Sequence, residues 1–128
     1  MNMRTLTISL ATALAALVVP FAATATAKDG DVRIGGSCTG STSAKIKLSP
    51  EDGRIETEFE VDQNRGGVTW KIVLRRNGTV AARAQGTTGG PSGSFEIRRL
   101  LDDGPGSDSI SARAVSPTGE VCTAQASI

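Results

Sequence analysis

A strict alternation of side chains between Arg54 and Val61 constrains the fold of this chain more than any other feature. One side carries the charged residues Arg54, Glu56, Glu58 and Glu60. The other side carries the uncharged residues Ile55, Thr57, Phe59 and Val61. Side chains of a β-strand point alternately to two faces, so the segment predicts a strand with one charged face and one apolar face. The apolar face needs a second layer to cover it.

The same period-two pattern recurs along the rest of the chain. Residues 32–39, 43–49, 68–75, 94–98 and 108–116 read as further strands, and turn sequences rich in Gly, Pro, Asn and Asp separate them. No convincing helical periodicity follows residue 28. We therefore predict an all-β chain: a single antiparallel, immunoglobulin-like β-sandwich of about seven or eight strands.

Matching the apolar faces of neighbouring strands predicts the registers of two hairpins, one that contains the strand 54–61 and one that contains Trp70. A four-residue turn over residues 50–53 sets Leu48 opposite Ile55, with Lys47 opposite Glu56. For the hairpin at Asn77-Gly78, a two-residue loop would place Arg83 opposite the inward-facing Ile72. We therefore predict a three-residue loop over 76–78, with Gly78 left-handed in a β-bulge, which sets Lys71 opposite Arg83.

A third hairpin is expected near the carboxyl terminus. The three-residue turn 117–119 pairs Ala114 with Cys122 and Ala112 with Ala124, which keeps the apolar faces in register. Asp102-Asp103 and the glycines that follow form another turn cluster.

Residues 1–27 have the three parts of a secretory signal peptide. One cation, Arg4, precedes an apolar run from Leu6 to Ala23, and Ala25-Thr26-Ala27 resembles a cleavage signal. A retained transmembrane helix is the alternative, but Pro20 interrupts a run near the shortest spanning length. We predict a signal peptide at 1–27, a single domain at 28–128 and secretion to the extracellular space.

The chain has two cysteines, Cys38 and Cys122, and export would place both in an oxidising compartment. In an oxidising compartment they predict one disulfide, joining the first strand to the last. Of the 14 Lys and Arg only Arg4 falls in the signal peptide, and none of the 13 Asp and Glu does, so the exported charges balance. This balance argues against nucleic acid, or a membrane after signal cleavage, as a partner. We expect a monomer without a cofactor.

A series of short motifs resembles a known group of proteins. The motifs are Ser37-Cys38-Thr39-Gly40-Ser41, Asp52-Gly53-Arg54-Ile55-Glu56, Phe59-Glu60-Val61-Asp62-Gln63-Asn64-Arg65, Trp70, Gly93-Ser94-Phe95-Glu96, Ala112-Arg113-Ala114 and Thr118-Gly119-Glu120-Val121-Cys122. Together they look like small secreted actinobacterial proteins with an immunoglobulin-like sandwich. The resemblance implies a fold and no function. The chain departs from true immunoglobulin domains, since it has no Tyr for a tyrosine corner.

Catalytic chemistry has little support in the composition. Without His, a Ser-His-Asp arrangement is excluded. The acid pairs Glu51-Asp52 and Asp102-Asp103 lie in turn sequences, and few aromatic residues are present to hold a sugar. Asp102, Asp103 and Asp108 offer oxygen ligands for calcium, but their spacing matches no calcium-loop motif, and we assign no metal. We predict that the protein is not an enzyme.

A basic patch is the candidate partner-binding site. On the predicted register Lys71, Arg75 and Arg83 share the outer face of one hairpin, and Arg65 and Arg76 are possible additions. Neighbouring glutamates could neutralise this patch. An acidic wall polymer or an acidic protein is the sharper hypothesis, and it predicts salt-sensitive binding to envelopes that bear teichoic acid.

The sequence therefore predicts a secreted, non-catalytic binding or structural module with an unknown protein or cell-wall partner. Loops 62–67 and 87–93 are further places where a partner could bind. The alternatives are a proteinase inhibitor that presents the second loop, whose glycines make it flexible, and a carrier for a small molecule.

Overall fold

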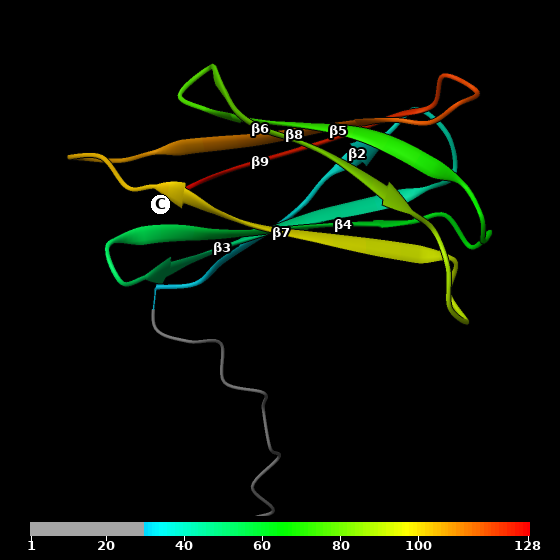
Figure 1. Cartoon of the computed structure of the whole chain (residues 1–128), viewed down its shortest axis with the longest axis horizontal. Helices are drawn as coiled ribbons and strands as arrows, with labels where there is room; N and C mark the ends of the chain where they lie inside the picture. The colour runs from blue at the N-terminus through cyan, green and yellow to red at the C-terminus, as the bar shows by residue number, and fades with distance from the viewer. Residues whose placement is uncertain (1–29) are drawn as a thin grey trace, which may run out of the picture.

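The computed structural model describes residues 30–128, so the predicted signal peptide and its cleavage point lie outside the described residues. The described chain forms β-strands joined by turns and loops (Figure 1). The strands are β1 (Val32–Gly35), β2 (Ser37–Cys38), β3 (Ser43–Glu51), β4 (Arg54–Asp62), β5 (Thr69–Arg76), β6 (Thr79–Thr87), β7 (Ser94–Asp102), β8 (Ser109–Val115) and β9 (Val121–Ser127).

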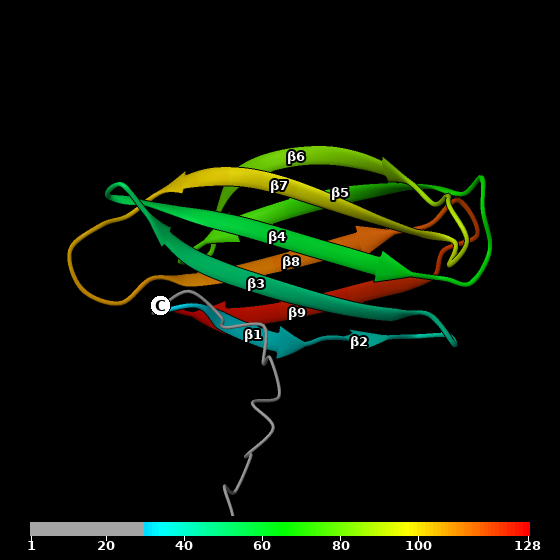
Figure 2. The same cartoon turned by 90° about the horizontal axis from the view of Figure 1, so that it is seen from below.

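Two antiparallel sheets face each other, which confirms the predicted sandwich. The four-stranded sheet has the order β1-β3-β4-β7, and the five-stranded sheet has the order β2-β9-β8-β5-β6. Figure 2 shows the four-stranded sheet in front of the five-stranded one. The described residues contain nine strands instead of seven or eight, partly because the predicted first strand is divided between the sheets.

The division falls at Gly36, where the chain crosses from one sheet to the other. β1 pairs with β3, whereas β2 pairs with β9. A side chain at Gly36 would collide with the carbonyl oxygen of Thr123, so this close approach requires glycine. Immediately after the crossing, Cys38 lies directly opposite Cys122 and is bonded to it. The predicted disulfide is confirmed, and it joins two neighbouring strands of the same sheet.

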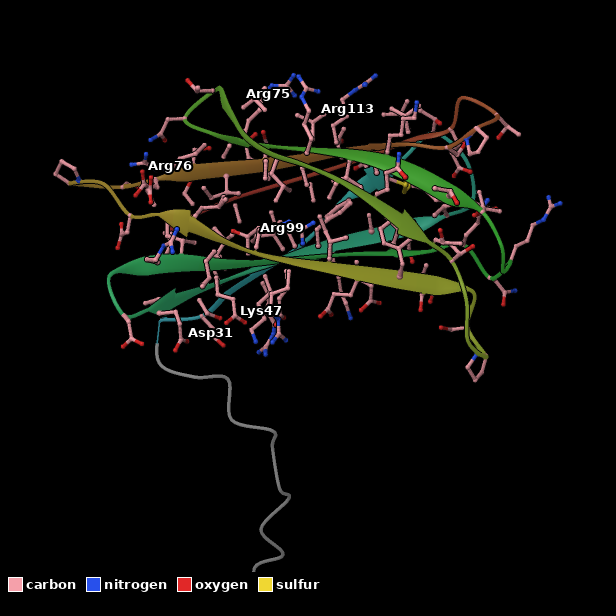
Figure 3. All side chains as sticks on the ribbon, in the orientation of Figure 1. Asp31, Lys47, Arg75, Arg76, Arg99 and Arg113 are labelled. Atoms are coloured by element: carbon pink, nitrogen blue, oxygen red, sulfur yellow. A yellow bond between two sulfur atoms is a disulfide. The ribbon has the colours of Figure 1, made fainter. Side chains whose placement is uncertain are left out.

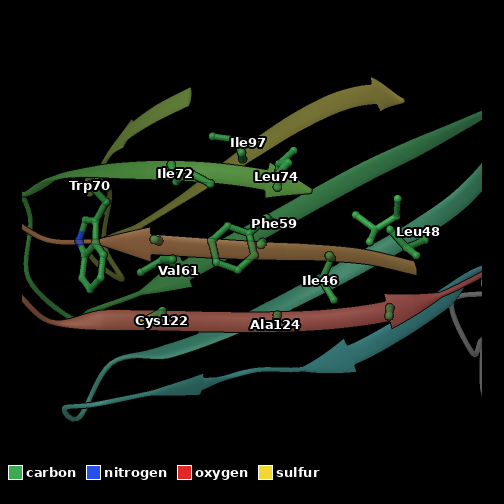
Figure 4. Packing of buried hydrophobic residues seen from close by; sticks show 14 of the residues in the cluster. Ile46, Leu48, Phe59, Val61, Trp70, Ile72, Leu74, Ile97, Cys122 and Ala124 are labelled. Atoms are coloured by element: carbon green, nitrogen blue, oxygen red, sulfur yellow. The ribbon is translucent and has the colours of Figure 1, made fainter. Parts of the chain in front are cut away.

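The inner faces of both sheets meet in one apolar core (Figure 4). Trp70, Phe59 and Phe95 all belong to it, and the first two are fully buried. Trp70 lies at one end of the core, where its indole N–H donates a 3.2 Å hydrogen bond to the Oε1 atom of Gln63. β8 and β9 contribute small residues to the same core, among them Ala112 and Ala124. One contiguous core therefore holds both sheets together.

The predicted register of the β3–β4 hairpin was wrong by two residues. Leu48 lies opposite Thr57 instead of Ile55, and Lys47 lies opposite Glu58 instead of Glu56. The reason is the turn, in which Asp52 and Gly53 both have positive φ angles of 48° and 74°. This two-residue turn matches the twist of a hairpin, so pairing extends through residues 50 and 51. A shift of two leaves every side chain on its predicted face.

The predicted three-residue loop of the β5–β6 hairpin was also wrong. Arg76 pairs with Thr79, so only Asn77 and Gly78 form the turn, with φ angles of 49° and 84°. A two-residue loop was predicted to place Arg83 opposite the inward-facing Ile72. A bulge after Leu74 prevents this, because it skips one residue of β6 and sets Ile72 opposite Ala84. The β8–β9 hairpin has the predicted register, with Ala114 opposite Cys122 and Ala112 opposite Ala124.

Candidate functional site

Four cations gather on the outer face of the five-stranded sheet. Lys71 and Arg75 lie two residues to either side of Val73 on β5, and Arg83 on β6 and Arg113 on β8 lie directly opposite Val73 on the two neighbouring strands. Directly opposite residues of antiparallel strands point to the same face, so the four cations surround Val73. We call Lys71, Arg75, Arg83 and Arg113 the basic face.

The strands that carry the basic face contain no acidic residue. β2, β5, β6, β8 and β9 include neither Asp nor Glu over their whole lengths. None of the four cations forms an ion pair with another residue in the described range 30–128. Lys71, Arg83 and Arg113 are exposed, and Arg75 is half-buried. Their mutual repulsion is therefore left for water, salt or a ligand to offset.

The outer face of the four-stranded sheet is different, because carboxylates alternate with its cations and most of these cations are paired. Lys45 contacts Glu60 at 3.6 Å, and Lys47 contacts Glu58 at 3.7 Å. Arg98 donates a 2.6 Å hydrogen bond to the same Glu58 carboxylate. Figure 3 shows Arg75 and Arg113 projecting from one side of the sandwich and Lys47 from the other. A chain with a net charge of only +1 thus has one basic face and one mixed face.

Two shallow depressions adjoin the basic face. One has a volume of about 510 Å³, and Lys71 and Arg83 are its charged lining residues. The other has a volume of about 400 Å³, and Arg75 and Arg113 are its charged lining residues. Each depression is therefore lined by two cations.

The structure brings together three of the predicted partner-binding residues and separates the fourth. Lys71, Arg75 and Arg83 share one face as expected, although Lys71 lies opposite Gln85 and not opposite Arg83. Arg65 lies in the β4–β5 loop, with its backbone close to Gly93. Sequence reasoning missed Arg113, because β8 reaches β5 through a connection that no local pattern reveals. The absence of acids from these segments was the available signal.

Arg76 has a structural role. Its Nε atom donates a 2.9 Å hydrogen bond to the carboxylate of Asp108, whose side chain is only 1% exposed. Asn77 Nδ2 and the Gly104 backbone N–H donate to the same carboxylate at 3.0 and 3.1 Å. Burial raises the pKa of Asp108, but hydrogen bonds from Asn77, Asp103 and Gly104 and the charge of Arg76 outweigh burial and hold the pKa below its ordinary value.

The other two candidate calcium ligands are differently placed. Asp102 is exposed and lies 3.7 Å from Arg54. The pKa of Asp103 is raised, chiefly by its hydrogen bond to Asp108, and also by burial and by the Asp108 charge, with Arg76 acting in the opposite direction. Donors therefore occupy the Asp108 carboxylate, which ties the β7–β8 loop to the β5–β6 turn.

We expect the Asp108→Asn variant to melt several degrees below the wild type near neutral pH, and by much less in acid. The folded-state pKa of Asp108 is depressed, so its contribution is present above its unfolded pKa and is lost as pH falls through the folded pKa. Thermal melts at about pH 7 and about pH 2.5 check this. The exposed Asp52→Asn is the control, and a deficit for Asp108→Asn that stays constant with pH would contradict the assignment.

Loops 62–67 and 87–93 are held together at one end of the sandwich. The Gly67 backbone N–H donates to the Thr88 carbonyl at 2.7 Å, and the Thr88 N–H donates to the Val68 carbonyl at 2.9 Å. Thr88 is buried, and its hydroxyl accepts a 3.0 Å hydrogen bond from the Val68 N–H. The glycine-rich segment predicted to be flexible is therefore anchored, and its exposed part is a short turn around Pro91 and Ser92.

Within residues 30–128, one group has the spacing of a metal site: Cys38, Cys122 and Glu120. The two sulfurs are bonded to each other, so neither is a thiolate ligand. Glu120 also accepts a 3.3 Å hydrogen bond from the Thr42 backbone N–H. This group is accounted for by the disulfide and the turn beside it.

Comparisons with protein families, with curated proteins and with solved structures found no match to this chain. The described residues contain no helix of the length and apolar character that a membrane span requires. The resemblance to small secreted actinobacterial proteins stays a prediction.

Proposed function

We propose that this protein is a secreted, non-catalytic binding module that holds linear anionic polymers on its basic face. The observation that carries the proposal is the segregation of charge: the five-stranded sheet presents Lys71, Arg75, Arg83 and Arg113 without a single carboxylate on its strands. A face of one sign attracts ligands of the opposite sign, even on a chain whose total charge is close to zero. The disulfide supports an extracellular setting.

A polymer fits this face better than an acidic protein does. Protein interfaces gain most of their affinity from buried aromatic and apolar anchors. On these five strands the one aromatic residue is Trp70, which is fully buried in the core. The apolar side chain at the centre of the basic face is Val73, which is only half-buried. Charge and hydrogen bonding are therefore the forces that this face offers to a ligand.

The alternatives receive less support from the geometry. A protease binds an inhibitor loop in an extended conformation, whereas the exposed part of loop 87–93 is a tight turn in which Gly93 N–H donates to the Gly90 carbonyl at 3.4 Å. A carrier needs an apolar cavity, but side chains such as Trp70 and Phe59 fill the space between the sheets. A binding module requires neither feature.

We expect the exported protein to bind isolated envelope material that bears phosphodiester polymers, and to do so with strong salt dependence. If the four cations together neutralise between two and four phosphates, affinity falls about tenfold to a hundredfold between about 50 and 200 mM salt. Co-sedimentation across a salt series measures this. The variant with glutamine at Lys71, Arg75, Arg83 and Arg113 is expected to lose binding.

The matched control removes four exposed cations that lie elsewhere: Arg33, Lys45, Arg54 and Arg65. It changes the net charge equally, so its binding should stay within a few-fold of the wild type if the basic face is responsible. Binding that resists high salt, or equal losses in the two variants, would sink the proposal.

A further inference from the structure

We propose that the basic face is divided into two anion subsites, and that its ligand is a linear phosphodiester chain with short, flexible linkers between successive phosphates. This inference rests on the proposed function and adds to it the class of ligand and the mode of binding. It predicts that two adjacent anionic groups must be held at once.

The first subsite is the depression lined by Lys71 and Arg83, with Gln85 as a neutral hydrogen-bonding group beside them. Lys71 and Gln85 lie directly opposite each other on β5 and β6. The guanidinium group of Arg83 can donate two parallel hydrogen bonds to one phosphate, and the ammonium group of Lys71 adds a second positive charge. One phosphate group can therefore contact both cations.

The second subsite is the depression lined by Arg75 and Arg113, with the hydroxyl groups of Ser37, Ser111 and Thr123 around them. Arg75 lies directly opposite Ser111, and Arg113 lies directly opposite Thr123. These neutral groups donate and accept hydrogen bonds without adding a negative charge. The second subsite thus repeats the plan of the first: two cations with polar uncharged neighbours.

Val73 lies between the two cation pairs and lines the first depression, and the geometry of the sheet sets the distance between the pairs. Residues two apart on a strand are about 6.6 Å apart, and neighbouring strands are about 4.8 Å apart. The midpoint between the backbone positions of Lys71 and Arg83 is then on the order of 8 Å from the midpoint between those of Arg75 and Arg113, along a diagonal of the sheet. This separation suits successive phosphates joined by a short polyol.

The surroundings of the subsites favour a linker without rings. Proteins that bind single-stranded nucleic acids stack bases on aromatic side chains, and sugar rings also pack on aromatic faces. The five strands present no aromatic side chain on their outer face, because Trp70 is buried. A flexible polyol phosphate needs only the charged and hydrogen-bonding groups that the face provides.

The inference is tested with glycerol phosphate and its synthetic dimer, tetramer and octamer, using the exported protein and isothermal titration at low salt. Because the second phosphate of the dimer binds at a high effective concentration once the first is held, the dimer should bind at least about tenfold more tightly than the monomer. Longer oligomers should add smaller, statistical gains.

Three double variants with the same charge change make the test specific. The variants Lys71→Gln/Arg83→Gln and Arg75→Gln/Arg113→Gln each remove one whole subsite, so the dimer should bind no better than the monomer. The variant Lys71→Gln/Arg75→Gln removes one cation from each subsite, so binding weakens but the dimer keeps its advantage. Melting temperatures near that of the wild type show that each variant is folded.

The outcomes separate this inference from the proposed function. If all three double variants lose the same affinity and keep the same dimer advantage, the face acts by total charge and the two-subsite inference is overturned, while polymer binding stands. Tighter binding of a single-stranded nucleic acid or a polyuronate than of the glycerol phosphate octamer would also overturn it. If no oligomer and no envelope material binds the wild type, the proposed function itself fails.

Discussion

Replacing both Cys38 and Cys122 with alanine is expected to lower the free energy of unfolding by about 4–5 kcal/mol. The bond closes a loop across a sequence separation of 84 residues. Without it the unfolded chain gains the freedom that this loop removes, which favours unfolding. Cys122 is fully buried, so alanine keeps an apolar side chain at that position. Urea unfolding of both proteins measures the difference.

Reduction of the wild type provides an independent control for this variant. The reduced protein and the alanine variant should unfold at similar urea concentrations, since both lack the bond and retain the pairing of β2 with β9. A double variant that unfolds at the same midpoint as the oxidised wild type would contradict the expected stabilisation. Because a domain of this size is only marginally stable, the loss would be a large share of its total stability.

The Trp70→Ala variant is expected to be destabilised by about 3–5 kcal/mol, because it empties one end of the core. The side chain is completely buried among residues of both sheets. Chemical denaturation measures the effect.

Two further variants separate packing from hydrogen bonding at Trp70. The Gln63→Ala variant removes the acceptor of the indole N–H, and it should cost about 1 kcal/mol. The Leu100→Ala variant removes an apolar side chain that is 47% exposed, and its stability should stay within about 0.5 kcal/mol of the wild type. A Trp70→Ala variant no less stable than Leu100→Ala would show that the core does not depend on the indole ring.

The hairpins show where local patterns predict well and where they do not. The face to which each side chain points was right in β3, β4 and β5, because burial of an apolar face enforces a period of two. The partner across the strand was wrong in two hairpins, because a shift by two or a compensating bulge leaves the faces unchanged. The register of the β8–β9 hairpin was predicted correctly, because the three-residue turn 117–119 keeps the apolar faces of both strands on the same side.

The candidate site follows the same division. Lys71, Arg75 and Arg83 could be placed together because they belong to one hairpin, whose faces are set by alternation. Arg76, a possible addition to the predicted patch, is bound to Asp108 instead, and Arg113, which the prediction did not include, completes the basic face. Both assignments depend on contacts between residues more than thirty positions apart, which no local pattern encodes.

The amino-acid sequence by itself determined that the chain is all-β, that two sheets cover one apolar core, and that Cys38 and Cys122 are partners. These features depend on alternation and on cysteine count, which are local or compositional properties. Only the tertiary structure decided which strands are neighbours, and therefore that β8 lies beside β5 and that one outer face is free of carboxylates. The physical reason is that the outer face contributes little to burial, so its charge pattern emerges only when distant strands are aligned by packing of the core.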